Sequence, residues 1–357
     1  MTGDTPESTG KKAAAAATLS EAELAAVRER MVAAGVDVSE RLRAELIAGG
    51  RSNLTFRLDD GVGSWVLRMP PRVGRTPSAH DVAREHRVTS ALTGSDVPVA
   101  RPVVLCEDES AIGLPFFVAE YVAGVTVRSD SDLAALNDGT VDRSVRAIVA
   151  ALAALHRVDH VAVGLGDFGR PDAYAARQLR RWSGQWEIVQ PGDRQVDGLA
   201  TELRTHLERL LPPQRSTGIV HGDYRIDNTI LELGTGSPRV AAIVDWELCT
   251  IGDPVADVAM MCAYRHPALD LVLGVRSAWT SDRLPKVEEL AAMYEAAGGV
   301  PLDHWEFHLA LAYYKIAVIA AGIDHRYRAG ASVGPGLDRV AESVPRFLQA
   351  GLEMVRA

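Results

Sequence analysis

The spacing of apolar residues changes near residue 124, and this change limits the folds open to the chain more than any other feature. Up to that point, residues 41–123 contain short runs that alternate between apolar and polar positions, as half-buried strands do. Beyond it, residues 124–357 mostly repeat their apolar positions at helical spacing. A chain of 357 residues is also longer than one hydrophobic core usually extends, so two lobes are expected. The prediction is an α+β fold with a small β-rich lobe followed by a larger, mainly helical lobe.

The small lobe is expected to cover residues 19–123, with a helix ahead of its strands. Ser20 followed by acidic residues is a helix-start pattern, and the apolar spacing after it predicts a helix over 20–34. Two alternating runs around an Asp-Asp-Gly-Val-Gly turn predict a hairpin. A helix over 80–94 and two more strands over 100–124 complete the predicted lobe.

The large lobe is expected to cover residues 124–357. Its helices are predicted over 130–158, 171–188, 195–211, 254–265, 286–297, 302–324 and 338–355. One stretch, 217–247, departs from the helical pattern because it contains short apolar runs that are typical of strands. Two of these runs, 229–233 and 240–244, flank a Gly-Thr-Gly-Ser-Pro-Arg turn and predict a second hairpin.

Polar side chains gather at the ends of these short strands. The first strand leads into His221-Gly222-Asp223, and Asn228 follows Asp223 by five positions. The hairpin then returns the chain to Asp245. If its strands pair, Asn228 and Asp245 converge at one end of the hairpin, with Asp223 nearby. Asp227 is left as a turn residue or a structural acid.

This set of oxygen-bearing side chains suits phosphoryl transfer. One carboxylate can orient the attacking hydroxyl or accept its proton. An amide oxygen and a second carboxylate can hold Mg²⁺, a hard cation that prefers oxygen ligands. The remaining catalysis is positioning and charge neutralisation, and the Asp-x4-Asn spacing is that of the protein-kinase catalytic loop. A polar turn and a solvated strand end would explain each residue singly, but they explain the whole set poorly.

The joint pattern His-Gly-Asp-x4-Asn, Asp-Trp-Glu and Gly-Asp-Pro-x2-Asp resembles that of the aminoglycoside phosphotransferase and choline kinase-like family. The resemblance covers about residues 38–330 and is strongest at 219–259. It implies a protein-kinase-like two-lobed fold, in which the small lobe binds the nucleotide and the large lobe holds the catalytic loop, metal site and acceptor pocket. It also implies transfer of the γ-phosphate of ATP to a small-molecule hydroxyl.

The same resemblance assigns roles to residues of the His-Gly-Asp stretch. It implies that Asp223 is the catalytic base and that Asn228 and Asp245 bind Mg²⁺. His221 and Asp257 would support the loop and take no part in the reaction. His156, on an apolar helix, is expected to be a buried packing residue and not a catalyst.

The small lobe contains candidate nucleotide-binding residues. The turn after Gly49 and Gly50 can meet phosphates through its main chain and a hydroxyl, although an ordinary β-turn would look the same. Arg68 stands where the family usually has Lys, and it can bind phosphate as a fork. The resemblance further implies that the main chain between the lobes binds adenine. The expected nucleotide-binding residues are Ser52, Asn53, Arg68, Glu85, Glu120, Tyr121 and Val122, with Glu85 as the helical partner of Arg68.

The acceptor pocket is expected on two helices of the large lobe, and its candidate residues are Arg177, Arg181, Trp182, Lys315 and His325. Arg177 and Arg181 share one helix face. That face would repel a cationic aminoglycoside and would suit a phosphate, a carboxylate or coenzyme A, unless it is simply solvated. The helix at 313–332 resembles one in a subfamily whose animal members are fused to acyl-CoA dehydrogenase-like domains. This implies a hydroxylated metabolite, such as a hydroxy acid or its thioester, while an aminoglycoside-like acceptor stays open.

Composition narrows the expected partners and location. The net charge is -9 and no long Lys/Arg run occurs, which argues against nucleic acid. No run of about 18 uncharged apolar residues suggests a membrane helix. The three cysteines are widely spaced and fit a reducing cytoplasm. Residues 1–18 are small, polar and Ala-rich, and are expected to form a disordered tail. The expected protein is a cytoplasmic monomer or homodimer.

Two other functions stay open at this point. The first is a catalytically weak pseudokinase or regulatory module that binds a nucleotide, and Arg68 in place of Lys is the one feature that favours it. The second is a protein kinase. The chain has no His-Arg-Asp, and no Ala-Pro-Glu segment follows Asp245, so a protein kinase has little support. An O-phosphotransferase dependent on ATP and Mg²⁺ is the leading hypothesis.

Overall fold

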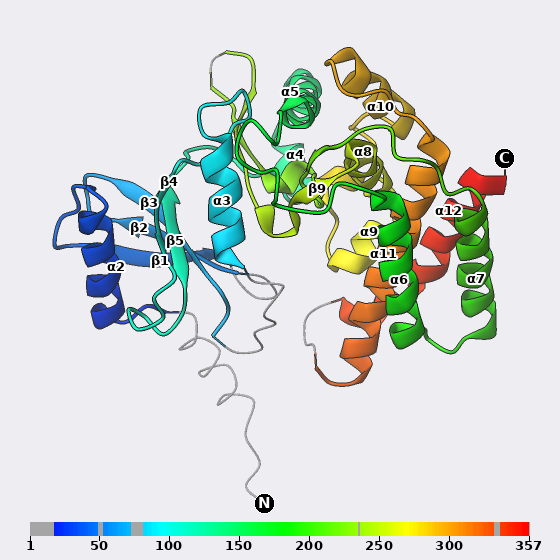
Figure 1. Cartoon of the computed structure of the whole chain (residues 1–357), viewed down its shortest axis with the longest axis horizontal. Coiled ribbons are helices and arrows are strands. Elements are labelled where there is room, and N and C mark those ends of the chain that lie inside the picture. Colours follow the sequence, from blue (N-terminus) through cyan, green and yellow to red (C-terminus); the bar gives the residue numbers. More distant parts are fainter. Residues whose placement is uncertain (1–17, 49–52, 73–80, 235, 332–335, 357) are drawn as a thin grey trace, which may run out of the picture. The chain divides into compact units, whose positions relative to one another are not determined.

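A computed structural model describes residues 18–48, 53–72, 81–234, 236–331 and 336–356, which fall into two compact units (Figure 1). The small unit holds the chain up to Gly94, Val99–Ala123 and Asp245–Glu247. The large unit holds Ser95–Pro98, Gly124–Val244 and the chain from Leu248 onward. All but the last residue of the tail predicted over 1–18 lies outside the described residues.

The small unit is built on a five-stranded antiparallel sheet with the strand order β1-β2-β3-β5-β4. Its strands are β1 (Arg43–Ala48), β2 (Leu54–Asp59), β3 (Ser64–Met69), β4 (Pro102–Cys106) and β5 (Phe116–Glu120). The Asp60 carboxylate accepts the N–H groups of Val62 and Gly63, at 2.9 and 2.7 Å. These bonds close the turn of the β2–β3 hairpin that the sequence predicted.

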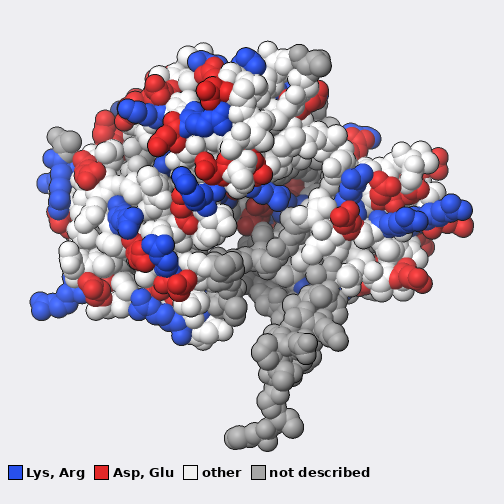
Figure 2. Space-filling model, turned by 180° about the vertical axis from the view of Figure 1, so that it is seen from behind, with Lys and Arg blue, Asp and Glu red and all other residues white. Residues whose placement is uncertain are grey.

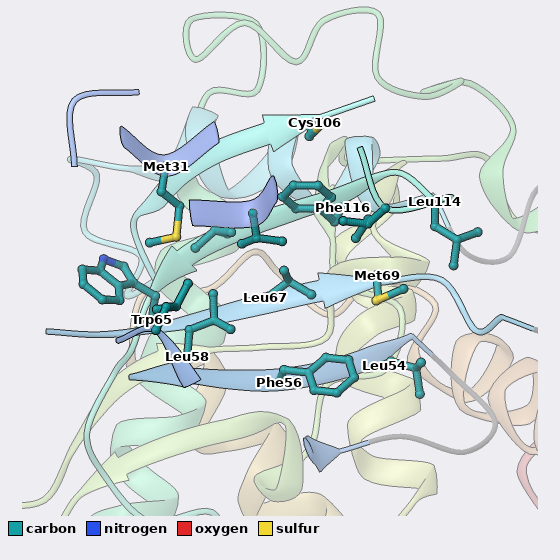
Figure 3. Close-up of a cluster of buried hydrophobic side chains, with 14 of the residues drawn as sticks. Met31, Leu54, Phe56, Leu58, Trp65, Leu67, Met69, Cys106, Leu114 and Phe116 are labelled. Atoms are coloured by element: carbon teal, nitrogen blue, oxygen red, sulfur yellow. The ribbon is translucent and has the colours of Figure 1, made fainter. Parts of the chain in front are cut away.

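Two helices cover opposite faces of this sheet. Phe116 of β5 belongs to a buried cluster that includes Met31 of α2 (Glu21–Ala33), and Figure 3 shows both side chains in that cluster. Phe117, the next residue along β5, packs with Val82 of α3 (Val82–Leu92) instead. Successive side chains of a strand point to opposite faces, so α2 and α3 lie on different sides.

The large unit is mainly helical. Its helices are α4 (Asp130–Ala134), α5 (Asp138–Arg157), α6 (Tyr174–Val189), α7 (Arg194–Arg209), α8 (Pro254–Ala263), α9 (Leu269–Leu273), α10 (Val287–Ala296), α11 (Trp305–Arg328) and α12 (Val344–Arg356). α11 packs against α6, α8 and α12 and is the central helix of the unit. The segment predicted as one helix over 130–158 is broken before α5, because the Asn137 side chain caps a new helix start at the Thr140 N–H.

Among the described helices, α11 is long and apolar enough to cross a membrane by length and composition, although the sequence had suggested no such segment. Its most apolar stretch is 83% buried inside the protein. Burial of this kind is typical of the core helix of a globular unit. On the face shown in Figure 2, acidic and basic side chains are interspersed, without an extended area of one sign.

Two pairs of short antiparallel strands complete the large unit. β7 (Thr229–Glu232) pairs with β8 (Arg239–Ile243), which confirms the predicted hairpin, with each strand ending one residue before its predicted end. β6 (Gly218–Val220) pairs with β9 (Thr250–Gly252). The sequence did not predict β9 because three residues are too few to show an alternating pattern. The two pairs flank the His-Gly-Asp loop.

Candidate active site

Asp257 of α8 supports the His-Gly-Asp loop by accepting hydrogen bonds from the loop backbone. One carboxylate oxygen of Asp257 accepts the His221 N–H at 2.6 Å, and the other accepts the Gly222 N–H at 2.8 Å. Burial alone would raise the pKa of Asp257, but the hydrogen bond and charge of His156, together with the other donors, lower it below its usual value. Asp257 therefore has the geometry of a support for the loop.

Two further buried side chains, His156 and Tyr294, form a chain of polar contacts that leads from Asp257. His156 Nε2 lies 3.3 Å from the Asp257 carboxylate, and its Nδ1 lies 2.8 Å from the Tyr294 hydroxyl. All three side chains are buried, so His156 is the packing residue that the sequence suggested. Gly222 has φ +88, and a Cβ atom there would lie 2.9 Å from the Leu248 carbonyl oxygen. Only glycine fits this turn without strain.

The imidazole ring of His221 holds the loop through two contacts with the main chain. Its Nε2 lies 3.0 Å from the Val244 carbonyl oxygen, and its Nδ1 lies 3.3 Å from the Asp223 backbone nitrogen. A carbonyl can only accept and a backbone N–H can only donate, so this pattern assigns the proton to Nε2. His221 thus contacts loop and strand backbone, which agrees with a supporting position.

Asp223 and Asn228 lie side by side. The Asn228 amide nitrogen donates to the Asp223 carboxylate at 3.1 Å and to the Asp223 carbonyl oxygen at 2.7 Å. This orientation leaves the Asn228 amide oxygen as the atom that can serve a cation. The Val244 N–H donates to the Asn228 carbonyl oxygen at 3.0 Å, and Asp245 is the next residue of the chain.

Two residues that sequence reasoning missed surround Asp223. Arg225 Nε lies 3.4 Å from the Asp223 carboxylate, and Tyr264 donates a hydrogen bond to it. The Arg225 guanidinium also lies 3.0 Å from Asp227 and 5.3 Å from the centre of the Tyr264 ring. Burial would raise the pKa of Asp223, but the charge of Arg225 and the Tyr264 hydrogen bond lower it. The ion pair with Arg225 also shows that Asp227 is a structural acid and not only a turn residue.

The sequence held one signal for Arg225 and none for Tyr264. Arg225 lies between two acidic residues of the same short loop, so an ion pair could have been suspected. Tyr264 caps the end of α8, far along the chain from Asp223, and nothing in its neighbourhood marks it. Only the packing of α8 under the loop brings the phenol to the carboxylate.

In the small unit, Arg68 joins two carboxylates. Its guanidinium lies 3.2 Å from Glu85 and 3.0 Å from Asp245. Asn53 also donates to Glu85, at 2.6 Å. Burial raises the pKa of Glu85 to about 7, against the opposing attraction of Arg68. Glu85 is thus the helical partner of Arg68, as the sequence suggested.

The other expected nucleotide-binding residues divide into three groups. Ser52 lies outside the described residues. Asn53 is buried, and its amide nitrogen donates a hydrogen bond to the Glu85 carboxylate. The Glu120 N–H donates to the Arg101 carbonyl at 2.8 Å, and the Tyr121 N–H donates to the Ser64 carbonyl at 3.2 Å. A purine at this segment would have to use other main-chain groups, of which the Val122 N–H is the next along the chain.

The large unit contains a pocket beside the His-Gly-Asp loop. Its lining includes Tyr174, Gln178, Trp182, Gly222, His308 and Lys315. The Lys315 ammonium donates to the Gly222 carbonyl at 3.3 Å and lies 5.7 Å from the centre of the Trp182 ring. The structure therefore places two of the expected acceptor residues, Trp182 and Lys315, in one pocket.

The other three expected acceptor residues do not line that pocket. Arg177 donates to the Arg170 carbonyl, and the exposed Arg181 lies 5.3 Å from the centre of the Trp182 ring. His325 is exposed in the last turn of α11. His308, which sequence reasoning did not select, does line the pocket. It lies in the first turn of α11, seven residues before Lys315, and helical spacing could have linked the two.

Comparison with known proteins places the chain in a family. A sequence model described as the phosphotransferase enzyme family matches residues 43–308, which is most of the chain. Acyl-CoA dehydrogenase family member 10 of Mus musculus is 36% identical over 286 residues, covering 79% of this chain and 26% of the mouse protein. The chain thus spans about a quarter of the length of that relative.

Solved structures agree with this assignment. A Ralstonia eutropha protein, provisionally described as an aminoglycoside phosphotransferase, is 31% identical with a TM-score of 0.78, covering 93% of this chain and 98% of its own. Aminoglycoside phosphotransferase APH(4)-Ia in complex with AMP-PNP and hygromycin B shares the fold at 16% identity and a TM-score of 0.59, covering 92% of this chain and 98% of its own. These likenesses confirm the predicted kinase-like fold, and the chain belongs to the phosphotransferase enzyme family.

Proposed function

We propose that this protein is an O-phosphotransferase that moves the γ-phosphate of ATP to the hydroxyl of a small molecule in the presence of Mg²⁺. The observation that carries the proposal is the pairing of Asp223 with Asn228 in a loop that Asp257 holds by two backbone hydrogen bonds. A reacting carboxylate needs such fixed placement, because phosphoryl transfer depends on positioning more than on covalent chemistry.

Asp223 is proposed to orient the acceptor hydroxyl and take its proton. Its pKa is lowered, since the charge of Arg225 and the hydrogen bond from Tyr264 outweigh the effect of burial. The group is therefore a carboxylate at neutral pH and can accept a hydrogen bond from a hydroxyl. Arg225 and Tyr264 also fix its direction, which limits the orientations in which an acceptor can bind.

The residues proposed as metal ligands fit Mg²⁺ in their chemistry. The Asn228 amide nitrogen is occupied by Asp223, so the amide presents its oxygen, and Asp245 adds a carboxylate. Mg²⁺ prefers oxygen ligands and often takes only one or two carboxylates from a protein, with phosphate and water completing its shell. Bound Mg²⁺ would neutralise charge on the phosphates of the nucleotide.

The nucleotide is proposed to bind at the small unit through Arg68 and the segment around Val122. Arg68 is fixed by Glu85, and a guanidinium has five N–H donors, so it can hold that acid and a phosphate together. The solved structure of APH(4)-Ia with AMP-PNP supports a nucleotide site in this fold. We also propose a reducing compartment such as the cytoplasm, since the three cysteines are buried and none of them is in a disulfide bond.

The acceptor is proposed to be a hydroxylated metabolite, with an aminoglycoside-like molecule as the second candidate. The relatives named as acyl-CoA dehydrogenases favour a metabolite, and the name of the Ralstonia eutropha protein favours an aminoglycoside. A catalytically weak regulatory module is the alternative function. Arg68 in place of Lys is the feature that favours it, while the presence of Asp223, Asn228 and Asp245 together opposes it.

A screen for ATP consumption tests the proposal. Hydroxylated metabolites, hydroxy acids and aminoglycosides would each be added with Mg²⁺ and ATP, and organic phosphate would be identified by mass spectrometry. We expect phosphate on at least one acceptor, and its loss with the matched variant Asp223→Asn. Tight ATP binding with phosphate on none of them would contradict the proposal and favour the regulatory module.

A further inference from the structure

The pocket beside the His-Gly-Asp loop is a groove between two helices. Its α11 residues are His308 and the residues three, four and seven positions after it, Leu311, Ala312 and Lys315, so they lie on one face of that helix. Its α6 residues, Tyr174, Gln178 and Trp182, follow at intervals of four. At about 1.5 Å of rise per residue, Lys315 and His308 lie about 10 Å apart along the groove.

Lys315 marks the end of the groove nearest the catalytic loop. Within the described part of the chain, its ammonium donates one hydrogen bond, to the carbonyl of Gly222, the residue before Asp223. An ammonium has three donors, so this bond leaves capacity for a ligand. The Arg181 guanidinium and the Lys315 ammonium both lie over the indole ring of Trp182, at 5.3 and 5.7 Å from its centre. A second cation therefore lies next to this end of the groove, although Arg181 does not line the groove itself.

The acids near Lys315 are already occupied by other donors. Asp257 also lines the groove, but its two oxygens accept the N–H groups of His221 and Gly222 and contact His156. Asp223 is paired with Arg225. Burial lowers the pKa of Lys315 in spite of the attraction of Asp223 and Asp257, with Arg181 acting in the same direction as burial. The neighbouring acids therefore do not compensate fully for the burial of the ammonium.

His308 marks the other end of the groove with an unused acceptor. Its side chain is buried, and its Nδ1 has no hydrogen-bond partner among the residues that the structure describes. Its Nε2 lies 3.6 Å from the Asp253 carboxylate, which favours the proton on Nε2. Burial lowers the pKa of His308 against the attraction of Asp253, which favours the neutral ring, and the Nδ1 of a neutral ring can accept a hydrogen bond. A hydroxyl or amide N–H of a ligand would satisfy it.

We propose that Lys315 is the specificity-determining residue of the acceptor site and that it selects an acceptor carrying an oxyanion near the reacting hydroxyl. This rests on the proposed phosphotransferase function. The ammonium binds the oxyanion, the apolar middle of the groove covers a short hydrocarbon stretch, and His308 Nδ1 accepts a donor at the far end. A polycation such as an aminoglycoside is excluded, because it would meet the Lys315 ammonium with like charge.

Three alcohols of equal chain length provide the test. 3-Hydroxyhexanoate, hexane-1,3-diol and 1-aminohexan-3-ol share a hydroxyl on the third carbon and differ only in whether the group on the first carbon, close to that hydroxyl, is anionic, neutral or cationic. Acceptor-dependent ATP turnover would be measured for each with the wild-type protein. We expect kcat/KM for hydroxyhexanoate to exceed that for hexanediol by about tenfold or more, as for a hydrogen bond to a charged group, and aminohexanol to be poorest.

Variants then assign this preference to Lys315. Lys315→Met should abolish it, whereas Lys315→Arg, which keeps the charge, should retain part of it. Lys286→Met is the matched control, because Lys286 is an exposed residue ahead of α10 and does not line the groove. A preference for aminohexanol, or the same preference for the anion in Lys315→Met, would overturn the inference.

A binding measurement separates failure of this inference from failure of the proposed function. The chain has four lysines, Lys11, Lys12, Lys286 and Lys315, so acetylation at each can be followed by mass spectrometry. Hydroxyhexanoate should protect Lys315 selectively, with Lys286 as internal reference. Protection without turnover of any acceptor supports the site and contradicts the phosphotransferase. Turnover without protection, or no protection by any of the three alcohols, overturns the role of Lys315.

Discussion

Two buried carboxyl groups, Asp257 in the large unit and Glu85 in the small unit, are almost equally inaccessible, at 0% and 1% exposure, yet their pKa values are shifted in opposite directions. The pKa of Asp257 is lowered, because backbone N–H groups and His156 offset its burial. The pKa of Glu85 is raised to about 7, because Arg68 and Asn53 do not offset its burial.

This difference in pKa suits two different roles. Asp257 is a permanent support of the loop, whereas Glu85 belongs to a charge cluster that can respond to a ligand. Asp257 is bound by main-chain donors that belong to the fold, so its environment changes little while the fold persists. Glu85 depends mainly on one guanidinium, which also contacts Asp245, a proposed metal ligand. A bound nucleotide or cation would redistribute those charges. The loop of the large unit is therefore expected to be rigid, and the charge cluster of the small unit adjustable.

The largest expected effect concerns the group that the rigid loop presents. Asp223→Asn keeps the shape of the side chain and removes the carboxylate that would accept the hydroxyl proton. Turnover should fall roughly 10²–10⁴-fold, while ATP binds as before. Steady-state kinetics and calorimetry measure the two quantities. Wild-type-like turnover in this variant would refute the assignment of Asp223 as the base.

Removal of the support should cost stability. Asp257→Ala leaves the N–H groups of His221 and Gly222 and the His156 ring without their buried acceptor. Each unsatisfied buried donor costs about 1–3 kcal/mol, so the free energy of unfolding should fall by about 3 kcal/mol or more. Urea titration followed by circular dichroism measures it. A loss below about 1 kcal/mol would show that Asp257 is not a rigid support.

Glu85 should give a pH dependence of its own. Its folded-state pKa of about 7 lies above its ordinary value of 4.5, so the folded protein holds an extra proton between those values. The free energy of unfolding should then decrease as the pH rises from about 4.5 to about 7, by an amount on the order of 2 kcal/mol. Asp257, with a lowered pKa, contributes in the opposite sense, since its stabilisation is lost as the pH falls.

The variant Glu85→Gln isolates that contribution. It keeps the buried shape and cannot ionise, so the decrease in stability between about pH 5 and pH 7.5 should become smaller than in the wild-type protein. Urea unfolding at several pH values measures the slope. Parallel slopes in the two proteins would mean that Glu85 is already fully paired, and the contrast with Asp257 would fail.

The smallest expected effect is at Arg68. Lys in its place keeps the charge but loses the fork that reaches both Glu85 and Asp245. The affinity for Mg·ATP should fall roughly threefold to tenfold, as for the net loss of one ordinary hydrogen bond. Calorimetry checks this, with Arg43→Lys, a change of an exposed residue of β1, as a control. Unchanged affinity would show that Lys and Arg are equivalent at this position.

The sequence alone anticipated the parts of the site that depend on short spacing. Asp223 and Asn228 are five residues apart in one loop, and the β7–β8 hairpin leads directly to Asp245, so local pattern was sufficient for them. The lobe order was also predictable, because alternation and helical spacing are local signals. Asp257 was found through the residues around it, which resemble those of the family.

The parts that were missed depend on contacts between distant segments. Tyr264 reaches Asp223 because α8 packs beneath the loop, and His308 lines the groove because α11 packs against α6. Arg177 and Arg181 were predicted to form a basic face of the acceptor pocket. Of the three candidates on that helix, Trp182 is the one that lines the groove. Which side of a helix faces a pocket is set by tertiary packing, and periodicity alone does not select among several polar positions.

The central claim is that Asp223 directs the γ-phosphate of ATP to a hydroxyl acceptor. The direct test follows radiolabel from ATP labelled at the γ position, and separately at the α position, into organic phosphate with the best acceptor of the screen. We expect transfer of the γ label only, dependent on Mg²⁺ and absent from Asp223→Asn. Label released solely as inorganic phosphate, or transfer that persists in Asp223→Asn, would contradict it.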